Sequence, residues 1–290
     1  MNVELVLDAQ ATLGEGAIWH ARERRLYWVD ITAGRVHAFD PSTGSDRCWE
    51  LGQPVGTVVP RARGGLMVAL HHGFAAYDPD KKELTPWSDP EEHLPRNRFN
   101  DGKCDPAGRF WAGTMSMDRE PQAGSLYCLY PDGNVQVRVR NVTTSNGITW
   151  SLDQKTMYYI DTPTRRVTAF DYDVDRGEIS HPRTILAVPE MNGKPDGMTI
   201  DAEGMLWIAH WDGSRVTRWD PRHGTLLDTI PVPAQRVTSC AFGGPELKDL
   251  FITSARSGLT DSELARQPQA GGLFCARPGV AGVTAFEFAG

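Results

Sequence analysis

The sequence predicts an all-β fold, a six-bladed β-propeller. Three observations support this prediction: a strand pattern that occurs six times, a nearly constant period, and strands rich in aromatic and β-branched residues. Starting from Leu26, successive repeats begin 40, 44, 47, 49 and 44 residues further along the chain. Self-similarity at this period, with several strands in each unit, is typical of propeller blades. The first strand signals lie at residues 26–30, 66–70, 110–114, 157–161, 206–210 and 250–254, and the second at 35–41, 73–79, 125–133, 166–173, 215–221 and 272–279.

Each unit is expected to contain four strands: an inner strand, the first apolar strand, the second strand and a weaker outer strand. Alternating side chains mark these strands, as in Arg215-Val-Thr-Arg-Trp219. Turn sequences separate them, among them Asp105-Pro-Ala-Gly108 and Asp201-Ala-Glu-Gly204. Six such units fill residues 1–290, which we interpret as a single propeller domain.

The ring is predicted to close through the N-terminal strand, which joins the last blade. The final segment, Val283–Phe288, needs a further strand to complete its blade, and Val3–Leu7 is the spare one. Such closure removes open sheet edges. Two insertions interrupt the regular spacing, at residues 116–124 and 255–272. They are either tolerated surface insertions or the rim of a binding site at one end of the scaffold.

The composition excludes several classes of function. A net charge of −7 argues against a nucleic-acid partner. No stretch of about 18 apolar residues occurs, so no membrane span is expected, and the start of the chain lacks the pattern of a signal peptide. The five cysteines are widely spaced and form no CxxC motif, which favours reduced thiols over disulfides. We therefore expect a cytoplasmic protein that binds neither nucleic acid nor membrane.

One position in each predicted inner strand should face the propeller axis, because inner strands line the central channel. Four of these six residues are carboxylates or amides, and a buried cluster of that kind is costly unless its groups are paired or hold a cation. Asn-Gly and Asp-Gly are also common tight-turn dipeptides, so a simple turn is the alternative for three of these motifs. In chain order the position holds Glu15, Val55, Asn100, Asn146, Asp196 and Thr238.

The oxygen-rich residues of this cluster indicate a site for one divalent cation. Oxygen ligands without Cys or His favour Ca²⁺, Mg²⁺ or Mn²⁺, and Zn²⁺ also binds carboxylates. Glu15 and Asp196 would balance the charge of such an ion, and Asn146 would add a neutral carbonyl. Three protein ligands leave positions open for water or substrate, as in catalytic metal sites.

The same residues lie in motifs through which the chain resembles the senescence marker protein/gluconolactonase (regucalcin-like) family. The resemblance extends over the whole chain. The matching stretches include Gly14-Glu15, Asn97-Arg-Phe-Asn-Asp-Gly-Lys103, Ala112-Gly-Thr-Met115, Ser145-Asn-Gly147, Tyr158-Tyr-Ile-Asp161, Pro195-Asp-Gly-Met198, Asp201-Ala-Glu-Gly204 and Arg266-Gln-Pro268.

The resemblance implies a six-bladed propeller that binds one divalent cation and hydrolyses sugar lactones to aldonic acids. By motif, the metal ligands of the family fall on Glu15, Asn146 and Asp196, and its substrate-contacting residues on Arg98 and Asn100. Asp118 occupies a further substrate position, where regucalcin-like members carry the longer Glu. This difference leaves the size and preference of the substrate open.

The implied reaction has two candidate bases. The cation would polarise the lactone carbonyl, and either Asp196 or a hydroxide held by the ion would activate the attacking water. Three other functions compete at the level of sequence: a non-enzymatic calcium-binding or regulatory protein, a protein-binding platform, and a related propeller esterase or phosphotriesterase. Nothing in the sequence marks an interface between subunits.

Overall fold

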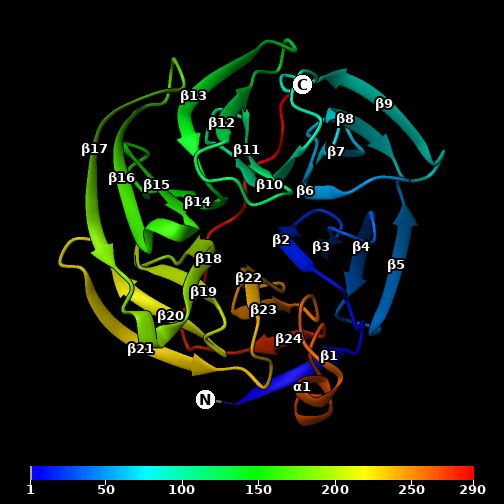
Figure 1. The fold of residues 1–290 in the computed structure, drawn as a ribbon, viewed down its shortest axis with the longest axis vertical. Coiled ribbons are helices and arrows are strands. Elements are labelled where there is room, and N and C mark those ends of the chain that lie inside the picture. Colours follow the sequence, from blue (N-terminus) through cyan, green and yellow to red (C-terminus); the bar gives the residue numbers. More distant parts are fainter. Residues whose placement is uncertain (1) are drawn as a thin grey trace.

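Six four-stranded antiparallel sheets stand around a common axis in the computed structural model, which describes residues 2–290 (Figure 1). Each sheet is one blade, and its first strand lies nearest the axis. Five blades use four consecutive strands, whereas the sixth takes its outer strand from the N-terminus. The predicted all-β, six-bladed propeller is confirmed.

The strands follow the predicted repeat closely. Blade 1 contains β2 (Gly14–His20), β3 (Arg25–Asp30), β4 (Arg35–Asp40) and β5 (Ser45–Glu50). Blade 2 contains β6 (Val55–Pro60), β7 (Leu66–Leu70), β8 (Gly73–Asp78) and β9 (Glu83–Ser88). Blade 3 contains β10 (Asn97–Cys104), β11 (Phe110–Ser116), β12 (Gly124–Leu129) and β13 (Val135–Val142).

The second half of the ring is built in the same way. Blade 4 contains β14 (Ser145–Trp150), β15 (Thr156–Asp161), β16 (Arg166–Asp173) and β17 (Glu178–Ala187). Blade 5 contains β18 (Lys194–Ile200), β19 (Leu206–Trp211), β20 (Arg215–Asp220) and β21 (Thr225–Pro231). Blade 6 contains β22 (Val237–Gly243), β23 (Asp249–Ser254), β24 (Leu273–Ala276) and β1 (Val3–Leu7). The short helices are η1 (Thr162–Thr164), η2 (Glu190–Asn192) and α1 (Asp261–Arg266).

The N-terminal strand closes the ring, but with a different partner from the one predicted. β1 pairs antiparallel with β24, in a register that sets Val3 opposite Ala276. Val283–Phe288 was the predicted partner, and that prediction is wrong: the segment forms no strand and leaves the blade altogether. The second apolar signal of the last repeat, at 272–279, already supplied the third strand of blade 6.

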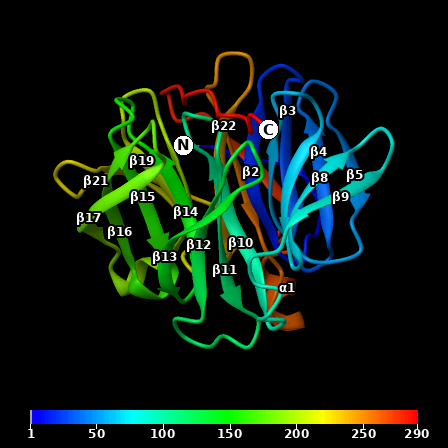
Figure 2. The ribbon, with the colours of Figure 1, turned by 90° about the horizontal axis from the view of Figure 1, so that it is seen from above.

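The segment after β24 instead crosses one end of the ring. Figure 1 shows the red end of the chain passing over the axis, and Figure 2 places it at the end opposite α1. It is bound to blade 5 where Ala202 N donates to Ala281 O, and to blade 2 where Phe288 N donates to Pro60 O. Phe288 is fully buried there, with its ring 5.5 Å from that of Trp87.

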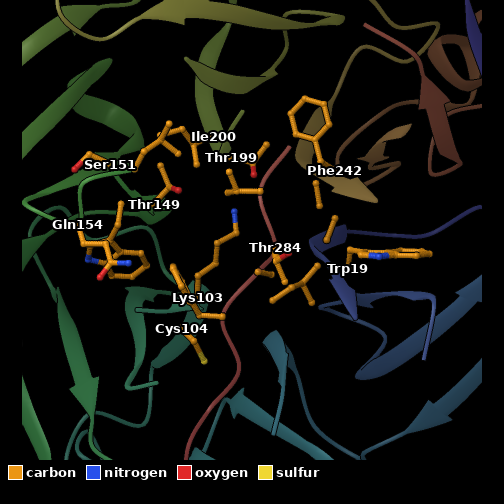
Figure 3. A pocket seen from close by; sticks show the side chains of 18 residues that line it. Trp19, Lys103, Cys104, Thr149, Ser151, Gln154, Thr199, Ile200, Phe242 and Thr284 are labelled. Carbon is orange, nitrogen blue, oxygen red and sulfur yellow. The ribbon is translucent and has the colours of Figure 1, made fainter. Parts of the chain in front are cut away.

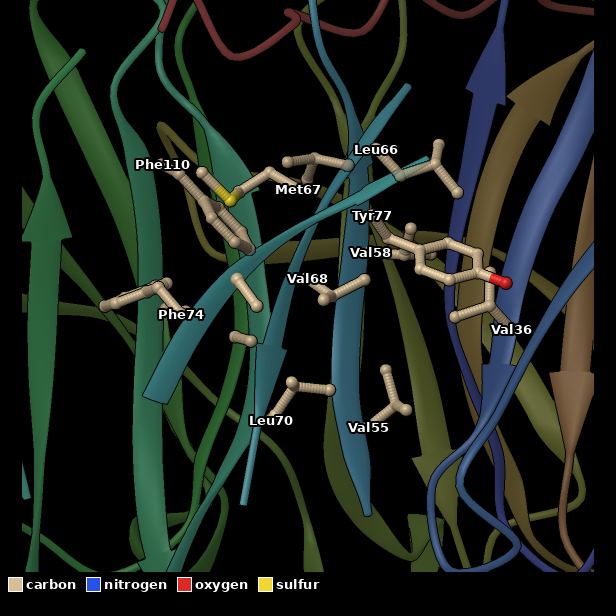
Figure 4. Packing of buried hydrophobic residues seen from close by; sticks show 14 of the residues in the cluster. Val36, Val55, Val58, Leu66, Met67, Val68, Leu70, Phe74, Tyr77 and Phe110 are labelled. Carbon is tan, nitrogen blue, oxygen red and sulfur yellow. The ribbon is translucent and has the colours of Figure 1, made fainter. Parts of the chain in front are cut away.

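The hydrophobic core lies between the blades, because each sheet is covered by a neighbour on both faces. β7 shows the consequence: all five residues of Leu66–Leu70 are buried, and the strand is a continuous apolar run. Figure 4 shows Val58 and Val68 of blade 2 packed between Val36 of blade 1 and Phe110 of blade 3. The core therefore holds the inner strands in a fixed ring, which is what positions their polar side chains.

Candidate functional site

Every inner strand is irregular near its start, at the predicted ligand position. In each of the six blades the pairing between the first and second strands shifts register at that point, for example between Ser145 and Ile148 in β14. Such β-bulges redirect side chains and are common beside functional sites. Asn146 and Asp196 lie within bulges of this kind. The alternative of simple turns at Asn-Gly and Asp-Gly is wrong for these positions.

The glycines of these motifs allow neighbouring inner strands to approach each other closely. A Cβ added at Gly147 would lie 2.7 Å from the backbone oxygen of Asp196 and 2.6 Å from Cβ of Met198. One added at Gly197 would lie 2.7 Å from Oγ of Ser239 in the next blade. Glycine is therefore needed for the spacing between blades, which brings Asn146 close to Asp196.

Three of the predicted side chains, Glu15, Asn146 and Asp196, are gathered in a buried cluster, each about 4% exposed. Asn146 is oriented by a chain of hydrogen bonds: its Nδ2 donates to Thr162 Oγ1 at 2.9 Å, and that hydroxyl donates to Pro195 O at 2.9 Å. Among residues 2–290, no group is hydrogen-bonded to Oδ1 of Asn146 in this arrangement. The same part of the chain offers no partner to Oδ1 of Asp196, which is also buried.

The charges of the cluster are dominated by three carboxylates. Burial, and next the charge of Asp101, raise the pKa of Glu15 to about 8. Burial, followed by the charges of Glu15 and Asp101, raises the pKa of Asp196 well above its ordinary value. Carboxylates crowded in a buried space repel one another unless a proton or a cation lies among them.

Asp101 is a third carboxylate, and it belongs to an Asp-Gly pair of the kind for which a simple turn was the alternative. It lies within β10 and is buried, and its Oδ1 accepts from Gly102 N while Oδ2 has no partner. The turn interpretation is wrong. Its proximity to Glu15 and Asp196 follows from the bulge in β10, which directs two successive residues, Asn100 and Asp101, away from regular pairing. The amino-acid sequence alone does not indicate that Asp101 lies near Glu15 and Asp196.

Arg98 and Asn100 lie beside the carboxylates and bind each other. Nη1 of Arg98 donates to Oδ1 of Asn100 at 2.8 Å, and Nδ2 of Asn100 donates to Ser145 O at 2.8 Å. Both side chains are buried. Burial lowers the pKa of Arg98 to about 10, against the opposing effect of the Glu15 carboxylate. The guanidinium stays charged at neutral pH and faces the same space.

The remaining predicted residues lie outside this cluster of polar groups. Val55 is buried and apolar, and Thr238 donates its hydroxyl hydrogen to Gly14 O, which links blade 6 to blade 1. Asp118 is exposed, in the loop after β11, and its Oδ2 accepts from Nε of Arg96 at 2.7 Å. The structure therefore places Asp118 at the surface, in the loop that follows the strand paired with Arg98.

Both insertions lie at the end of the ring that carries the cluster. Each insertion follows the second strand of its blade. Second strands end at the same end of the ring where inner strands begin. The bridge between Leu13, just before β2, and Ala255, just after β23, is an example. The 255–272 insertion contains α1, which Figure 2 shows at the end opposite the C-terminal segment. Only this end of the axis is free of the C-terminal segment, so we place the approach to the cluster here.

A separate cavity of about 200 Å³ occupies the other end of the axis, beneath the C-terminal segment. Figure 3 shows Lys103 extending into it, with Thr149 and Thr199 on one side and Thr284 of the crossing segment nearby. Nζ of Lys103 donates to Met198 O. The charge of Lys103 also favours the ionised form of Asp101 and thereby opposes the effect of burial on the Asp101 pKa.

The cluster fits a divalent cation on the chemistry of its donors. Two buried oxygens, one on Asn146 and one on Asp196, lack partners, and Glu15 supplies a second carboxylate. Within residues 2–290, no three side chains of the His, Cys, Asp and Glu types are arranged to hold a metal. A cation site therefore depends on the Asn146 amide as its third ligand, which is the set that the sequence predicted.

Comparison with known families assigns the chain to one of them. Residues 13–256 match the family described as the SMP-30/Gluconolactonase/LRE-like region. The chain belongs to this family. The matched range includes Glu15, Asn146 and Asp196 and the strands that carry them, so the family resemblance inferred from sequence motifs is confirmed.

Curated relatives of the SMP-30/gluconolactonase family span the full chain. Regucalcin of Xenopus laevis is 41% identical over 296 residues, covering 100% of this chain and 99% of that one. YvrE of Bacillus subtilis, named as a candidate sugar lactone lactonase, is 41% identical over 290 residues with the same coverage.

Solved structures of this family have the same fold. A luciferin-regenerating enzyme matches with a TM-score of 0.94 and 35% identity, over 99% of both chains. Regucalcin of Agrobacterium tumefaciens, described as a calcium-binding protein, matches with a TM-score of 0.93 and 28% identity, over 98% of this chain and 96% of that one. These names differ in activity, so the fold alone does not choose among them. No helix formed by residues 2–290 has the length and apolarity that a membrane crossing needs.

Proposed function

We propose that this protein is a lactonase that hydrolyses sugar lactones with one divalent cation held by Glu15, Asn146 and Asp196. The observation that carries the proposal is the pair of buried oxygens without partners, Asn146 Oδ1 and Asp196 Oδ1, beside the Glu15 carboxylate. Membership of a family that includes gluconolactonases supports it, as does the relative named for lactonase activity. A bound cation would supply Lewis-acid polarisation of the lactone carbonyl.

The residues of the chain would divide the remaining work. Thr162 holds the Asn146 amide so that its oxygen faces the cluster. Arg98 would donate hydrogen bonds to the oxygens of the lactone, where negative charge develops during attack on the carbonyl. Asn100 fixes the guanidinium through its own Oδ1 and would orient the sugar hydroxyls.

Asp196 is the proposed general base, which would accept a proton from the attacking water. In the metal-free cluster, burial and like charges favour its protonated form, whereas a neighbouring cation favours the carboxylate. Replacement by Asn separates its two proposed roles, because an amide oxygen still binds a cation but accepts no proton at neutral pH. Retained cation binding with lost hydrolysis in Asp196→Asn is the outcome expected for a base at this position.

Asp118 is proposed to contact the substrate from the rim. Its carboxylate is bound to Arg96 at the surface, so a sugar hydroxyl would share or replace that ion pair. Asp118→Ala should then raise KM while kcat changes little, because the contact would not involve the reacting atoms. An unchanged KM for every lactone hydrolysed would exclude Asp118 from substrate recognition.

Acid release from a panel of five- and six-carbon aldonolactones, followed by pH-stat, tests the proposal directly. Protein stripped of metal would be supplied with Ca²⁺, Mg²⁺, Mn²⁺ or Zn²⁺ singly. Hydrolysis should return with at least one cation, fail in Asp196→Asn, and persist in Asp132→Asn, a remote and exposed carboxylate used as the matched control. No hydrolysis above the spontaneous rate with any of these cations would refute the lactonase.

A second candidate, a calcium-binding protein without enzymatic activity, is favoured by the similarity to the Agrobacterium regucalcin, which is described as a calcium-binding protein. It would use the same unpartnered oxygens. Calorimetric titration with each cation distinguishes the two: a cation that binds to wild type and restores no hydrolysis would favour the binding protein.

A further inference from the structure

Three side chains that the proposed lactonase does not use come together on the two outer strands of blade 1. His37 on β4 is the cross-strand partner of Cys48 on β5, and Nε2 of His37 lies 3.7 Å from Sγ of Cys48. Asp46 precedes Cys48 by two residues, so it projects from the same face of β5. Its Oδ2 lies 2.7 Å from Nδ1 of His37. Thiol, imidazole and carboxylate are thus linked through the opposite nitrogens of one ring.

The imidazole of this cluster is held in a fixed orientation. The ring of Trp28 stacks on it, with centroids 3.9 Å apart and planes inclined by 18°, and His37 is buried. Because a carboxylate only accepts hydrogen bonds, Asp46 requires the hydrogen on Nδ1 and directs Nε2 toward the sulfur. Burial lowers the pKa of His37, but hydrogen bonds to Asp46 and Cys48 outweigh it and raise the value to about 9.

Cys48 differs from the other four cysteines in its exposure to solvent. It is exposed, whereas Cys104, Cys128 and Cys240 are buried and Cys275 is partly buried. Burial raises the thiol pKa of all four, to about 12 for Cys240 and Cys275. Among the cysteines of residues 2–290, only Cys48 is an exposed residue with a neighbouring imidazole. A thiol next to a protonated, oriented imidazole is an arrangement that favours the reactive thiolate in proteins.

We infer that Cys48, His37 and Asp46 form a thiol modification site that reacts with low-molecular-weight disulfides. In the reaction, the Cys48 thiol gives its proton to water, the protonated His37 ring stabilises the resulting thiolate, and the sulfur attacks one sulfur of the disulfide. A bond from Cys48 to that sulfur forms as the S–S bond of the disulfide breaks, and the departing thiolate takes up a proton from water. The products are a mixed disulfide on the protein and one free thiol.

The modification site is separate from the proposed lactonase site. β5 is the outermost strand of blade 1 and β2, which carries Glu15, is the innermost (Figure 1). Three strand spacings amount to roughly 14 Å across the sheet. Failure of either proposal therefore leaves the other unaffected, and the test of the thiol site needs no substrate or cation.

The experiment measures the rate at which each cysteine of the folded protein reacts with the chromogenic disulfide DTNB, with the modified residue assigned by mass spectrometry. Cys48 should be modified first, in a fast phase that Cys48→Ser removes. His37→Gln and Asp46→Asn should each slow that phase about tenfold or more, because they remove the imidazolium that stabilises the thiolate or the carboxylate that keeps this ring protonated and oriented. Asp46→Asn keeps the buried ring, so it remains informative if His37→Gln folds poorly.

A matched control addresses the charge near the sulfur. Arg35 lies on the same face of β4 as His37 and pairs with Glu50 at 2.7 Å. Arg35→Gln should leave the fast phase within about twofold of wild type, because the inference assigns the rate to His37 and not to general positive charge. Equal rates in wild type, His37→Gln and Asp46→Asn would overturn the inference, as would modification of Cys275 before Cys48 or equal slowing by Arg35→Gln.

Discussion

Asn146 donates its amide hydrogen to Thr162 Oγ1 at 2.9 Å, and its own carbonyl oxygen is left buried without a partner. Thr162 lies in η1, on the connection between β15 and β16, and passes its hydroxyl hydrogen to Pro195, the residue before Asp196. One hydroxyl thus fixes the orientation of one proposed ligand and contacts the backbone next to another. This relationship gives the first prediction.

Thr162→Val should weaken binding of the divalent cation about 10- to 100-fold, since partners of this type orient metal ligands. The measurement is calorimetric titration of metal-stripped protein. Thr164→Val is the matched control, because Thr164 is an exposed residue of the same short helix whose hydroxyl donates only to Asp161 O. Equal affinities for the wild type and Thr162→Val would show that Asn146 is not a ligand, or that it does not need the Thr162 hydroxyl to orient its amide.

Cation binding should stabilise the fold. A ligand at about 100 times its Kd contributes about 2.7 kcal/mol to the free energy of unfolding. Thermal unfolding with and without cation measures this gain, which should shrink strongly in Asp196→Ala, because this variant lacks the oxygen ligand that Asp196→Asn keeps. The metal-free variant should be no less stable than metal-free wild type, because it removes one of three crowded carboxylates. A large loss of stability in the metal-free variant would contradict that account of the cluster.

The His37–Asp46 pair should make stability depend on pH. The folded pKa of His37, about 9, lies above its ordinary value of 6.5, so the pair contributes fully below about pH 6.5. The contribution, about 1.5–3 kcal/mol for a hydrogen bond to a charged group, is lost as the pH rises through about 9. Denaturant unfolding at pH 6.5 and 9.5 measures the loss, which should be smaller in Asp46→Asn. Besides Asp46, the titratable group hydrogen-bonded to this ring is Cys48, also on β5.

The C-terminal segment should contribute strongly to stability. Phe288→Ala should cost about 3–5 kcal/mol, because it empties a fully buried aromatic site between the segment and blade 2. Phe286, two residues earlier, is 37% exposed, and Phe286→Ala should cost less than about 1 kcal/mol. Chemical denaturation of both variants makes the comparison. Similar costs at the two positions would mean that the segment is not anchored by Phe288.

The sequence predicted the blades because each one repeats a local pattern. Strand length, alternation and turn residues are properties of nearby residues, and they located β3 and β7 to within about one residue. The candidate ligands Glu15, Asn146 and Asp196 were found because the repeat register set them at equivalent positions. The repeat register did not predict the backbone conformation of the motifs that contain these residues, because a bulge and a tight turn favour the same Asn-Gly and Asp-Gly pairs.

The errors concern contacts between residues that are far apart in sequence. Val283–Phe288 has the composition of a strand, but blade 6 was already complete with β1, so the segment found its partners in blades 2 and 5. Asp101 belongs to an Asp-Gly pair typical of a turn, and its place beside the carboxylates of Glu15 and Asp196 depends on strands from other blades. Local patterns carry no information about such partners, and only the assembled ring reveals them.

The pairing of β1 with β24 also has a consequence for the order of assembly. β1 is synthesised before every other strand of the ring, yet its partner is the last strand made. Blades 1 to 5 can form from neighbouring strands as they emerge, whereas blade 6 waits for a contact across nearly the whole chain, which is slow to form. A chain interrupted during translation would therefore keep β1 and an edge of blade 6 unpaired, and exposed edges of this kind promote aggregation. Closure of the ring thus distinguishes a finished chain from an unfinished one.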